Sequence, residues 1–328
     1  MAYTGTGSSA DPAIPSTITE LYKILTDARN GNVNGNTSGP YYIKLTQDID
    51  CADDPNYIGY NGTLHFDPPN NSNRYIVRFY ASTKKSIRGL TVKDQWFMRL
   101  QHSDSGTTIK NIDFIDCFFK PIDNGENPEP TVFAAYVSSY ASIENSTISI
   151  NVYSYAPNYA PRISYQVAFR NCSVYLKYNS VYGFRTGNGI FNASTVNTNT
   201  TNNIFIFDGW YIPRLGSSWD YPICYLSSRC SYNAFIFKNA KFQNPNNIFG
   251  LIYGSYNYLA FVNPSLSGVS SPVAFQGFSE TSTSIIATDS SAYGTVITKG
   301  SDSSGVGYWL TLDELKSEQK LLDIGFVP

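Results

Sequence analysis

The stretch Ile109-Lys-Asn-Ile-Asp-Phe114 and its counterpart Phe169-Arg-Asn-Cys-Ser-Val174 carry the pattern that decides the fold of this 328-residue chain. An apolar residue is followed two positions later by Asn or Gly, and five positions later by a second apolar residue. Asn and Gly enter the left-handed αL region most readily, whereas other residues lose about 1–2 kcal/mol there. The pattern occurs seven times, with the turn residue at Gly89, Asn111, Asn145, Asn171, Gly209, Asn239 and Asn263.

The intervals between successive turn residues range from 22 to 38 residues, which suits coils of one repeated unit with loops of variable length. Flanking apolar residues then point into a stack, because side chains alternate across each strand, and stacked Asn side chains can bond to one another. The pattern therefore predicts an all-β chain, a right-handed single-stranded parallel β-helix. A β-sandwich of seven short strands is the alternative, but it explains the fixed Asn/Gly position less well.

Both ends carry helix signals that predict short capping helices. Thr17-Ile-Thr-Glu20 and Thr311-Leu-Asp-Glu314 are capping boxes, and each precedes apolar residues at helical spacing. Terminal helices would shield the open ends of a strand stack. We expect four parts: a flexible or partner-ordered arm that can attach to a particle (1–15), a capping helix and loop (16–40), the β-helix (41–300), and a linker with a second capping helix (301–328).

Composition excludes several classes of protein. Charged residues are 15% of the chain and the net charge is −2, so the basic footprint of a nucleic-acid binder is missing. No apolar run is long enough to insert into a membrane, and the N-terminus lacks the features of a signal peptide. We expect no cofactor and no metal, because phosphate loops and metal-type cysteine spacings are missing. The five cysteines are predicted to be buried free thiols, although Cys224 and Cys230 could close a small disulfide loop.

Catalytic candidates are few. Glycoside hydrolysis needs two carboxyl groups roughly 5–9.5 Å apart. Asp113 and Asp116 follow the second turn, Asp208 adjoins the fifth, and Asp220 lies in a loop. Asp113 is expected to point into solvent, and Asp208 to stack between Arg170 and Lys238 in a surface ladder of charges. These carboxylates are scattered, so binding is favoured over catalysis.

Aromatic residues gather in two loop regions and predict a binding role. Exposed Tyr and Trp rings stack on sugars or anchor protein interfaces, although packing beneath loops is the alternative for most of them. The candidates are Tyr153, Tyr155, Tyr159, Trp210, Tyr211, Trp219 and Tyr221.

Three segments resemble β-helical virion proteins of tailed bacteriophages: Tyr42-Ile-Lys-Leu-Thr-Gln-Asp-Ile-Asp50, the repeat type Ile109-Lys-Asn-Ile-Asp-Phe114, and the closing Leu312-Asp-Glu-Leu-Lys316 with Ile324-Gly-Phe-Val-Pro328. Such proteins serve as capsid decorations, head fibres, tail fibres or tailspikes. The resemblance implies a place on the virion surface, release by lysis without an export signal, other virion proteins as partners, host glycan as a further partner, and a homotrimer as one assembly.

Tailspikes usually carry a separate N-terminal particle-binding domain and often an acidic catalytic groove, and this sequence departs from both features. The departure favours a non-enzymatic structural protein of the virion surface. A carbohydrate-binding adhesin is the second hypothesis, and a tailspike-like glycan hydrolase or lyase is the third.

Overall fold

The computed structural model resolves a mostly β chain that divides into two compact units. The first comprises Met1–Tyr155 and Pro161–Cys172, and the second comprises Ala156–Ala160 and Ser173–Pro328. The structure describes residues 3–59, 62–67, 76–100, 107–122, 131–134, 141–153, 162–165, 167–178, 191–193, 203–209, 211–212, 224–226, 233–239, 241–242, 248–252, 258–262, 273–276, 285–288, 297–299 and 308–310.

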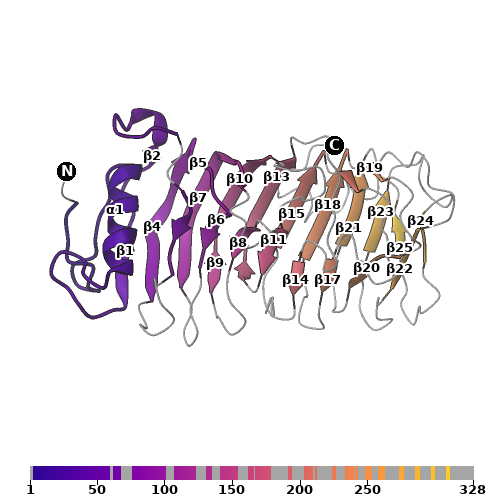
Figure 1. Cartoon of the computed structure of the whole chain (residues 1–328). Helices are drawn as coiled ribbons and strands as arrows, with labels where there is room; N and C mark the ends of the chain where they lie inside the picture. The colour runs from indigo at the N-terminus through magenta and orange to yellow at the C-terminus, as the bar shows by residue number, and fades with distance from the viewer. Residues whose placement is uncertain are drawn as a thin grey trace. The chain divides into compact units, whose positions relative to one another are not determined.

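In the first unit, strands of two parallel ladders alternate along the chain, so that each circuit adds a strand to both (Figure 1). The larger ladder contains β1 (Tyr41–Lys44), β2 (Ile49–Asp50), β4 (Val77–Arg88), β5 (Thr91–Val92), β7 (Thr108–Phe119), β9 (Ser142–Glu144), β10 (Thr147–Val152) and β12 (Ala168–Arg170). The smaller ladder contains β3 (Leu64–His65), β6 (Trp96–Arg99), β8 (Thr131–Ala134) and β11 (Arg162–Tyr165).

Apolar side chains stack in register on the inner side of the larger ladder. Aromatic rings of the smaller ladder meet them across the interior: Phe97 lies edge-on to Phe114 at 6.4 Å, and Phe133 to Phe169 at 5.5 Å between ring centroids. Such contacts join the two ladders by dispersion and burial. One column of register partners, fully buried throughout, is Ile43, Phe79, Ile109, Ile143 and Phe169.

The turn residues adopt the backbone conformation that the sequence pattern requires. All six that lie in the described residues have positive φ, between 50° and 75°, and Asn263 lies outside the described residues. Asn171 Nδ2 donates to Asn145 Oδ1 at 2.8 Å, so neighbouring turns are joined by an Asn–Asn bond. Asn111 Nδ2 donates to the Ala81 carbonyl at 2.9 Å.

The sequence pattern treats all seven turn residues alike, but the register shows that the turns of the first unit form two columns. Lys110, Glu144 and Arg170 pair with one another in register, which aligns the turns that follow them: Asn111, Asn145 and Asn171. Gly89 belongs elsewhere. Arg88 pairs with Ile115, and the Gly89 amide donates to the Ile115 carbonyl at 3.0 Å, which aligns Gly89 with Asp116. Asp116 itself has φ 51° and is a turn residue that the pattern missed.

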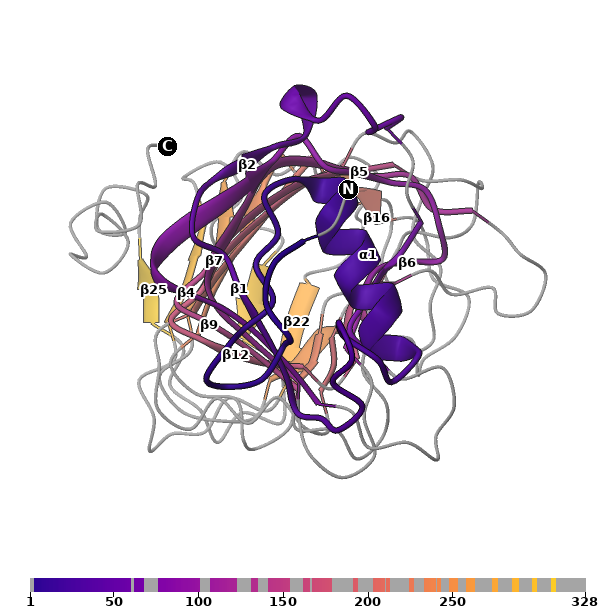
Figure 2. The ribbon, with the colours of Figure 1, turned by 90° about the vertical axis from the view of Figure 1, so that its left-hand side faces the viewer.

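The N-terminal capping helix is confirmed as α1 (Ile18–Arg29), which lies over the end of the interior between β1 and β6 (Figure 2). Thr17 Oγ1 accepts the Glu20 amide, as a capping box requires. The reciprocal bond is displaced by one residue, since Glu20 Oε2 accepts from the amide and hydroxyl of Ser16. The buried face consists of Ile18, Glu20, Leu21, Ile24, Leu25 and Ala28. The second capping helix, expected after Thr311, lies outside the described residues.

Residues 3–15, for which the sequence predicted a flexible or partner-ordered arm, bond to other parts of the same chain in this structure. They fold into a short hairpin, in which Thr4 and Ile14 form an antiparallel bridge, and Ala13 forms a parallel bridge to Ile43 in β1. Tyr3 is buried, and its hydroxyl donates to Asp27 Oδ2 in α1 at 2.6 Å. Burial of Tyr3 and main-chain bonding to β1 therefore order this segment on the chain itself. A short helical turn, η1 (Cys51–Asp53), follows β2.

The second unit repeats the arrangement of alternating parallel ladders. Apolar positions again stay in register, for example Phe205 with Phe235 and Leu259. One ladder contains β13 (Ser173–Tyr178), β15 (Asn203–Asp208), β18 (Asn233–Lys238), β21 (Tyr258–Val262), β23 (Ile285–Thr288) and β25 (Tyr308–Leu310). The other contains β14 (Phe191–Ala193), β17 (Cys224–Leu226), β20 (Ile248–Ile252), β22 (Val273–Gln276) and β24 (Ile297–Lys299), and β16 (Tyr211–Ile212) pairs with β19 (Lys241–Phe242).

Candidate functional site

Asp113 points away from the interior, as expected, but it links three strands. It lies in β7 between the apolar residues Ile112 and Phe114, which are both buried. Asp113 Oδ1 accepts the Thr147 amide of β10 at 2.6 Å and lies 3.3 Å from Lys84 Nζ of β4. The carboxylate thus satisfies a backbone donor where β10 begins, which gives it a structural task.

Asp116, the second carboxylate of the candidate pair, performs a different structural task. It occupies the αL turn opposite Gly89, and its Oδ2 lies 2.6 Å from Arg88 Nη1. Its side chain is 63% exposed, so this ion pair is largely solvated. Asp113 and Asp116 therefore face different partners, Thr147 and Lys84 for the first and Arg88 for the second. A glycosidase requires instead that two carboxyl groups flank one bond.

Asp208, in the second unit, also bonds to its own ladder. It accepts from the Tyr175 hydroxyl at 2.7 Å and from Asn239 Nδ2 at 2.8 Å. Its register partners are Lys177 and Lys238. The expected neighbour Lys238 is present, but Lys177 replaces Arg170, because the β13–β15 register differs from the one that the turn pattern implied.

Tyr175 is not an activated base. Burial, together with the hydrogen bond to the negatively charged Asp208, raises the pKa of Tyr175 to about 12. A tyrosine that abstracts a proton at neutral pH requires the opposite shift, because its phenolate must be accessible. The Tyr175–Asp208 pair is therefore a neutral hydroxyl held by a carboxylate. Asp220, the remaining catalytic candidate, lies outside the described residues.

Of the aromatic binding candidates, Tyr153 is described in full. It follows β10, and Lys120 Nζ lies 5.5 Å from the centre of its ring, within the range of a cation–π contact. Tyr211 lies in β16, but its side chain is outside what the structure describes. Tyr155, Tyr159, Trp210, Trp219 and Tyr221 lie outside the described residues, so the predicted aromatic clusters stay predictions.

A polar cluster behind α1 was not predicted from sequence. Asp67 is almost fully buried, with its Oδ1 2.8 Å from His65 Nδ1 and its Oδ2 3.2 Å from Arg99 Nε. The Arg99 guanidinium lies over the Trp96 ring at 4.4 Å. Arg99 and Asp67 come from separate parts of the sequence, and no short motif joins them. The burial of Asp67 is seen only in the structure, so the sequence gives no signal for this cluster.

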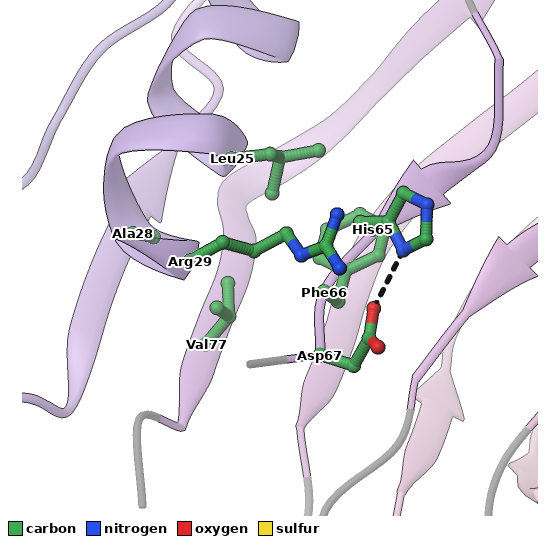
Figure 3. A pocket seen from close by; sticks show the side chains of 7 residues that line it. All are labelled: Leu25, Ala28, Arg29, His65, Phe66, Asp67 and Val77. Atoms are coloured by element: carbon green, nitrogen blue, oxygen red, sulfur yellow. Dashed lines mark hydrogen bonds and ion pairs between the residues drawn. The ribbon is translucent and has the colours of Figure 1, made fainter. Parts of the chain in front are cut away.

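A small cavity beside this cluster is too narrow for a substrate. Figure 3 shows the Arg29 side chain extending from the end of α1 toward Phe66 and His65. The cavity has no room for a whole water molecule. Ligand-binding clefts in proteins enclose about 300–1,000 Å³. We interpret the cluster as a link between β3 and β6, because Asp67 pairs with His65 of one strand and Arg99 of the other. Its lining consists of Leu25, Ala28, Arg29, His65, Phe66, Asp67 and Val77.

Buried thiols occupy the interior of the first unit. Cys51, Cys117 and Cys172 are free and buried, as predicted, and burial raises the pKa of Cys172 to about 11 and that of Cys51 to about 12. A reactive cysteine needs a lowered pKa, so these thiols are inert packing groups. Cys230 and the side chain of Cys224 lie outside what the structure describes. Among described residues, no three or more His, Cys, Asp or Glu side chains cluster to hold a metal, and no helix is long and apolar enough to cross a membrane.

The comparisons with known proteins found no relative of this chain. No protein-family description, no curated protein sequence and no solved structure matches the chain.

Proposed function

We propose that the chain is a non-enzymatic structural protein of the surface of a tailed-phage virion, built as a right-handed single-stranded parallel β-helix with a capping helix at each end. The observation that carries the non-enzymatic part is the use of the candidate carboxylates. Asp113, Asp116 and Asp208 each bond to groups of the ladders themselves. A catalytic carboxylate must instead face its substrate and its partner acid or base.

The virion part of the proposal is supported by the resemblance of three segments and by the architecture. Within each unit, parallel ladders grow by one strand per circuit, and each coil contacts only its neighbours. Stacks of this kind suit a decoration or fibre on a particle. Other virion proteins are the proposed partners, with the N-terminal end toward the particle, and a homotrimer is the proposed assembly.

Immunogold labelling tests the location. An antibody raised against the purified chain would be applied to particles banded from the lysate of an infected culture that makes it. We expect gold on the intact particles, at the head surface or on the tail. Signal that stays in the soluble fraction after banding, with bare particles, would contradict the virion proposal.

A glycan assay tests the non-enzymatic part separately. Purified protein would be incubated with capsular and cell-wall polysaccharide of the host, while reducing ends and the absorbance of unsaturated uronates are followed. We expect neither signal to rise above that of boiled protein. A rise that is lost in Asp208→Asn would favour the hydrolase or lyase. Retention of the protein on immobilised glycan without cleavage would favour the adhesin.

A further inference from the structure

Strand β1 ends the larger ladder of the first unit, and the N-terminal segment bonds to its outer edge. One set of its backbone groups faces β4: the Tyr41 amide donates to the Ile76 carbonyl at 2.7 Å, and the Leu45 amide to the Tyr80 carbonyl at 2.8 Å. The alternate set faces away from β4. An edge of this kind, if left open, is a template for the strand of another chain.

The N-terminal hairpin (residues 3–15) bonds that alternate set. The Tyr42 amide donates to the Gly7 carbonyl at 2.8 Å, and the Ala13 amide donates to the Tyr42 carbonyl at 2.9 Å. The Lys44 amide donates to the Ala13 carbonyl, also at 2.9 Å. Two residues of the hairpin therefore replace a whole neighbouring strand. The capping helix α1 makes none of these bonds, so it cannot close the edge by itself.

Glycine is required at two positions for the hairpin to close. Gly5 has φ +83°, and a Cβ built on it would lie 2.0 Å from the Pro12 carbonyl oxygen. Gly7 has φ +72°, and its Cβ would lie 2.8 Å from Val33 Cγ1. The first contact is with backbone, which cannot move aside while Ala13 stays bonded to β1. A single methyl group at Gly5 is thus enough to open the hairpin.

Other contacts hold the hairpin against the body of the chain. Asn34 Nδ2 donates to the Gly5 carbonyl at 2.8 Å, and the Tyr3 hydroxyl donates to Asp27. Lys23 Nζ pairs with Asp27 and lies 5.4 Å from the centre of the Tyr3 ring. Ala13 is completely buried. These anchors are local, within residues 3–43, so the hairpin can be removed without disturbing the turns or columns further along the ladder.

We propose that the N-terminal hairpin is a built-in edge blocker: it prevents β1 from pairing with the strand of a second copy of this chain, and opening it converts that edge into an interface. The partner is a second copy because an opened β1 edge on one chain can pair with the same opened edge on another, whereas strands inside the ladders already have partners. This inference concerns self-association and does not depend on the location in a virion.

The test uses full-length chains with Gly5→Ala and Gly7→Ala combined. Gly59→Ala is the matched control, because Gly59 has the same left-handed backbone, φ +87°, and nothing within 4 Å of its added Cβ. Sedimentation velocity would be measured over a range of protein concentration. We expect the double variant to reach about twice the mass of the wild type as concentration rises. The control should keep the wild-type mass.

Amide hydrogen exchange at Tyr42 and Lys44 identifies the interface. In the dilute double variant these two amides should exchange at least about tenfold faster than in the wild type, because their acceptors are gone. They should regain protection at the concentration where the mass doubles. A synthetic peptide of residues 1–15, added in excess, should return the double variant to the wild-type mass by occupying the edge.

The other outcomes overturn the proposal. If Tyr42 and Lys44 exchange rapidly while the mass stays constant, the edge is open but has no tendency to pair. If Gly59→Ala also associates, self-association reflects general strain rather than the edge. If the double variant precipitates, rescue of its solubility by the peptide supports the blocker, and failure of the peptide contradicts it.

Discussion

The inner and outer sides of the same strands in the first unit differ sharply in what they contain. Inward, Phe79 and its register partners form a continuous apolar column. Outward, one residue further along each strand, the corresponding column contains Lys44, Tyr80, Lys110, Glu144 and Arg170. The inner column is stabilised by the burial of apolar surface alone. The outer column contains charges of both signs, and Glu144 and Arg170 form an ion pair at 2.7 Å.

The difference separates stability from function. Burying apolar surface gives roughly 25 cal/mol per Å², whereas exposed ion pairs give about 0–1 kcal/mol each. Outer positions can therefore change with little effect on the fold. A surface that recognises a partner has to be built on that side, or on the loops and ends that extend from it.

Neighbouring substitutions in β4 provide the largest test of this contrast. Phe79→Ala should lower the free energy of unfolding by about 3–5 kcal/mol, because it leaves a cavity beside Phe66, whose ring stacks at 5.7 Å. Tyr80→Ala, one residue later on the outer side, is the matched control and should cost about 1 kcal/mol or less. Urea denaturation followed by circular dichroism measures both. Equal losses of stability would show that the outer side chain is packed as tightly as the inner one.

The second-largest effect is expected at high pH, which should lower the free energy of unfolding through a buried thiol of the inner side. Burial raises the pKa of Cys172 to about 11, so the unfolded chain loses this thiol proton at lower pH than the folded chain does. The stabilisation is complete below the thiol's ordinary range and is lost as pH rises from about 9 through 11, by about 1.4 kcal/mol per pH unit. Cys172→Ala should flatten that decline in urea titrations at successive pH values. An unchanged slope would mean that the thiol reaches solvent.

The fixed Asn/Gly position predicted this parallel fold because αL turns impose a conformational cost that few residues avoid. The same pattern did not distinguish Gly89 from Asn111. Both residues adopt the αL conformation, but they belong to two different columns of turns. The β4 register shifts between Tyr80 and Lys85, so that Ala81 to Lys84 bulge opposite Asn111. Pairing across strands decides such a shift, and no short sequence pattern encodes it.

The candidate site was less predictable for a related reason. Sequence placed Asp113 on the outer side correctly, because alternation along a strand is local. It could not show that Asp113 meets the Thr147 amide, 34 residues away. The sequence likewise did not predict the hairpin over β1, although Gly5 and Gly7, which alternate with Thr4, Thr6 and Ser8, were the available signal.

Substitutions at Asn111 sharpen the comparison of the two turn columns. Asn111→Gly keeps αL accessible and loses only the bond to the Ala81 carbonyl, at about 1 kcal/mol. Asn111→Val should cost about 1–2 kcal/mol more than Asn111→Gly, because a β-branched residue is strained at φ 58°. The difference between the two midpoints in urea isolates the backbone contribution. If the two variants unfold together, the turn conformation is not what Asn111 supplies.

The smallest effect is expected at Asp116, where the turn and the outer surface meet. Asp116→Asn keeps a residue that tolerates αL and removes the charge that pairs with Arg88. Both side chains are about half exposed or more, so solvent and salt screen the pair, and the loss should stay below about 1 kcal/mol. Added salt should shrink it further, since screening already weakens the wild-type pair. Asp116→Val keeps neither property and should cost clearly more, which would separate the conformational role of Asp116 from its charge. A large, salt-independent loss in Asp116→Asn would instead mean that this carboxylate bonds to something beyond Arg88, and it would return Asp116 to the catalytic candidates.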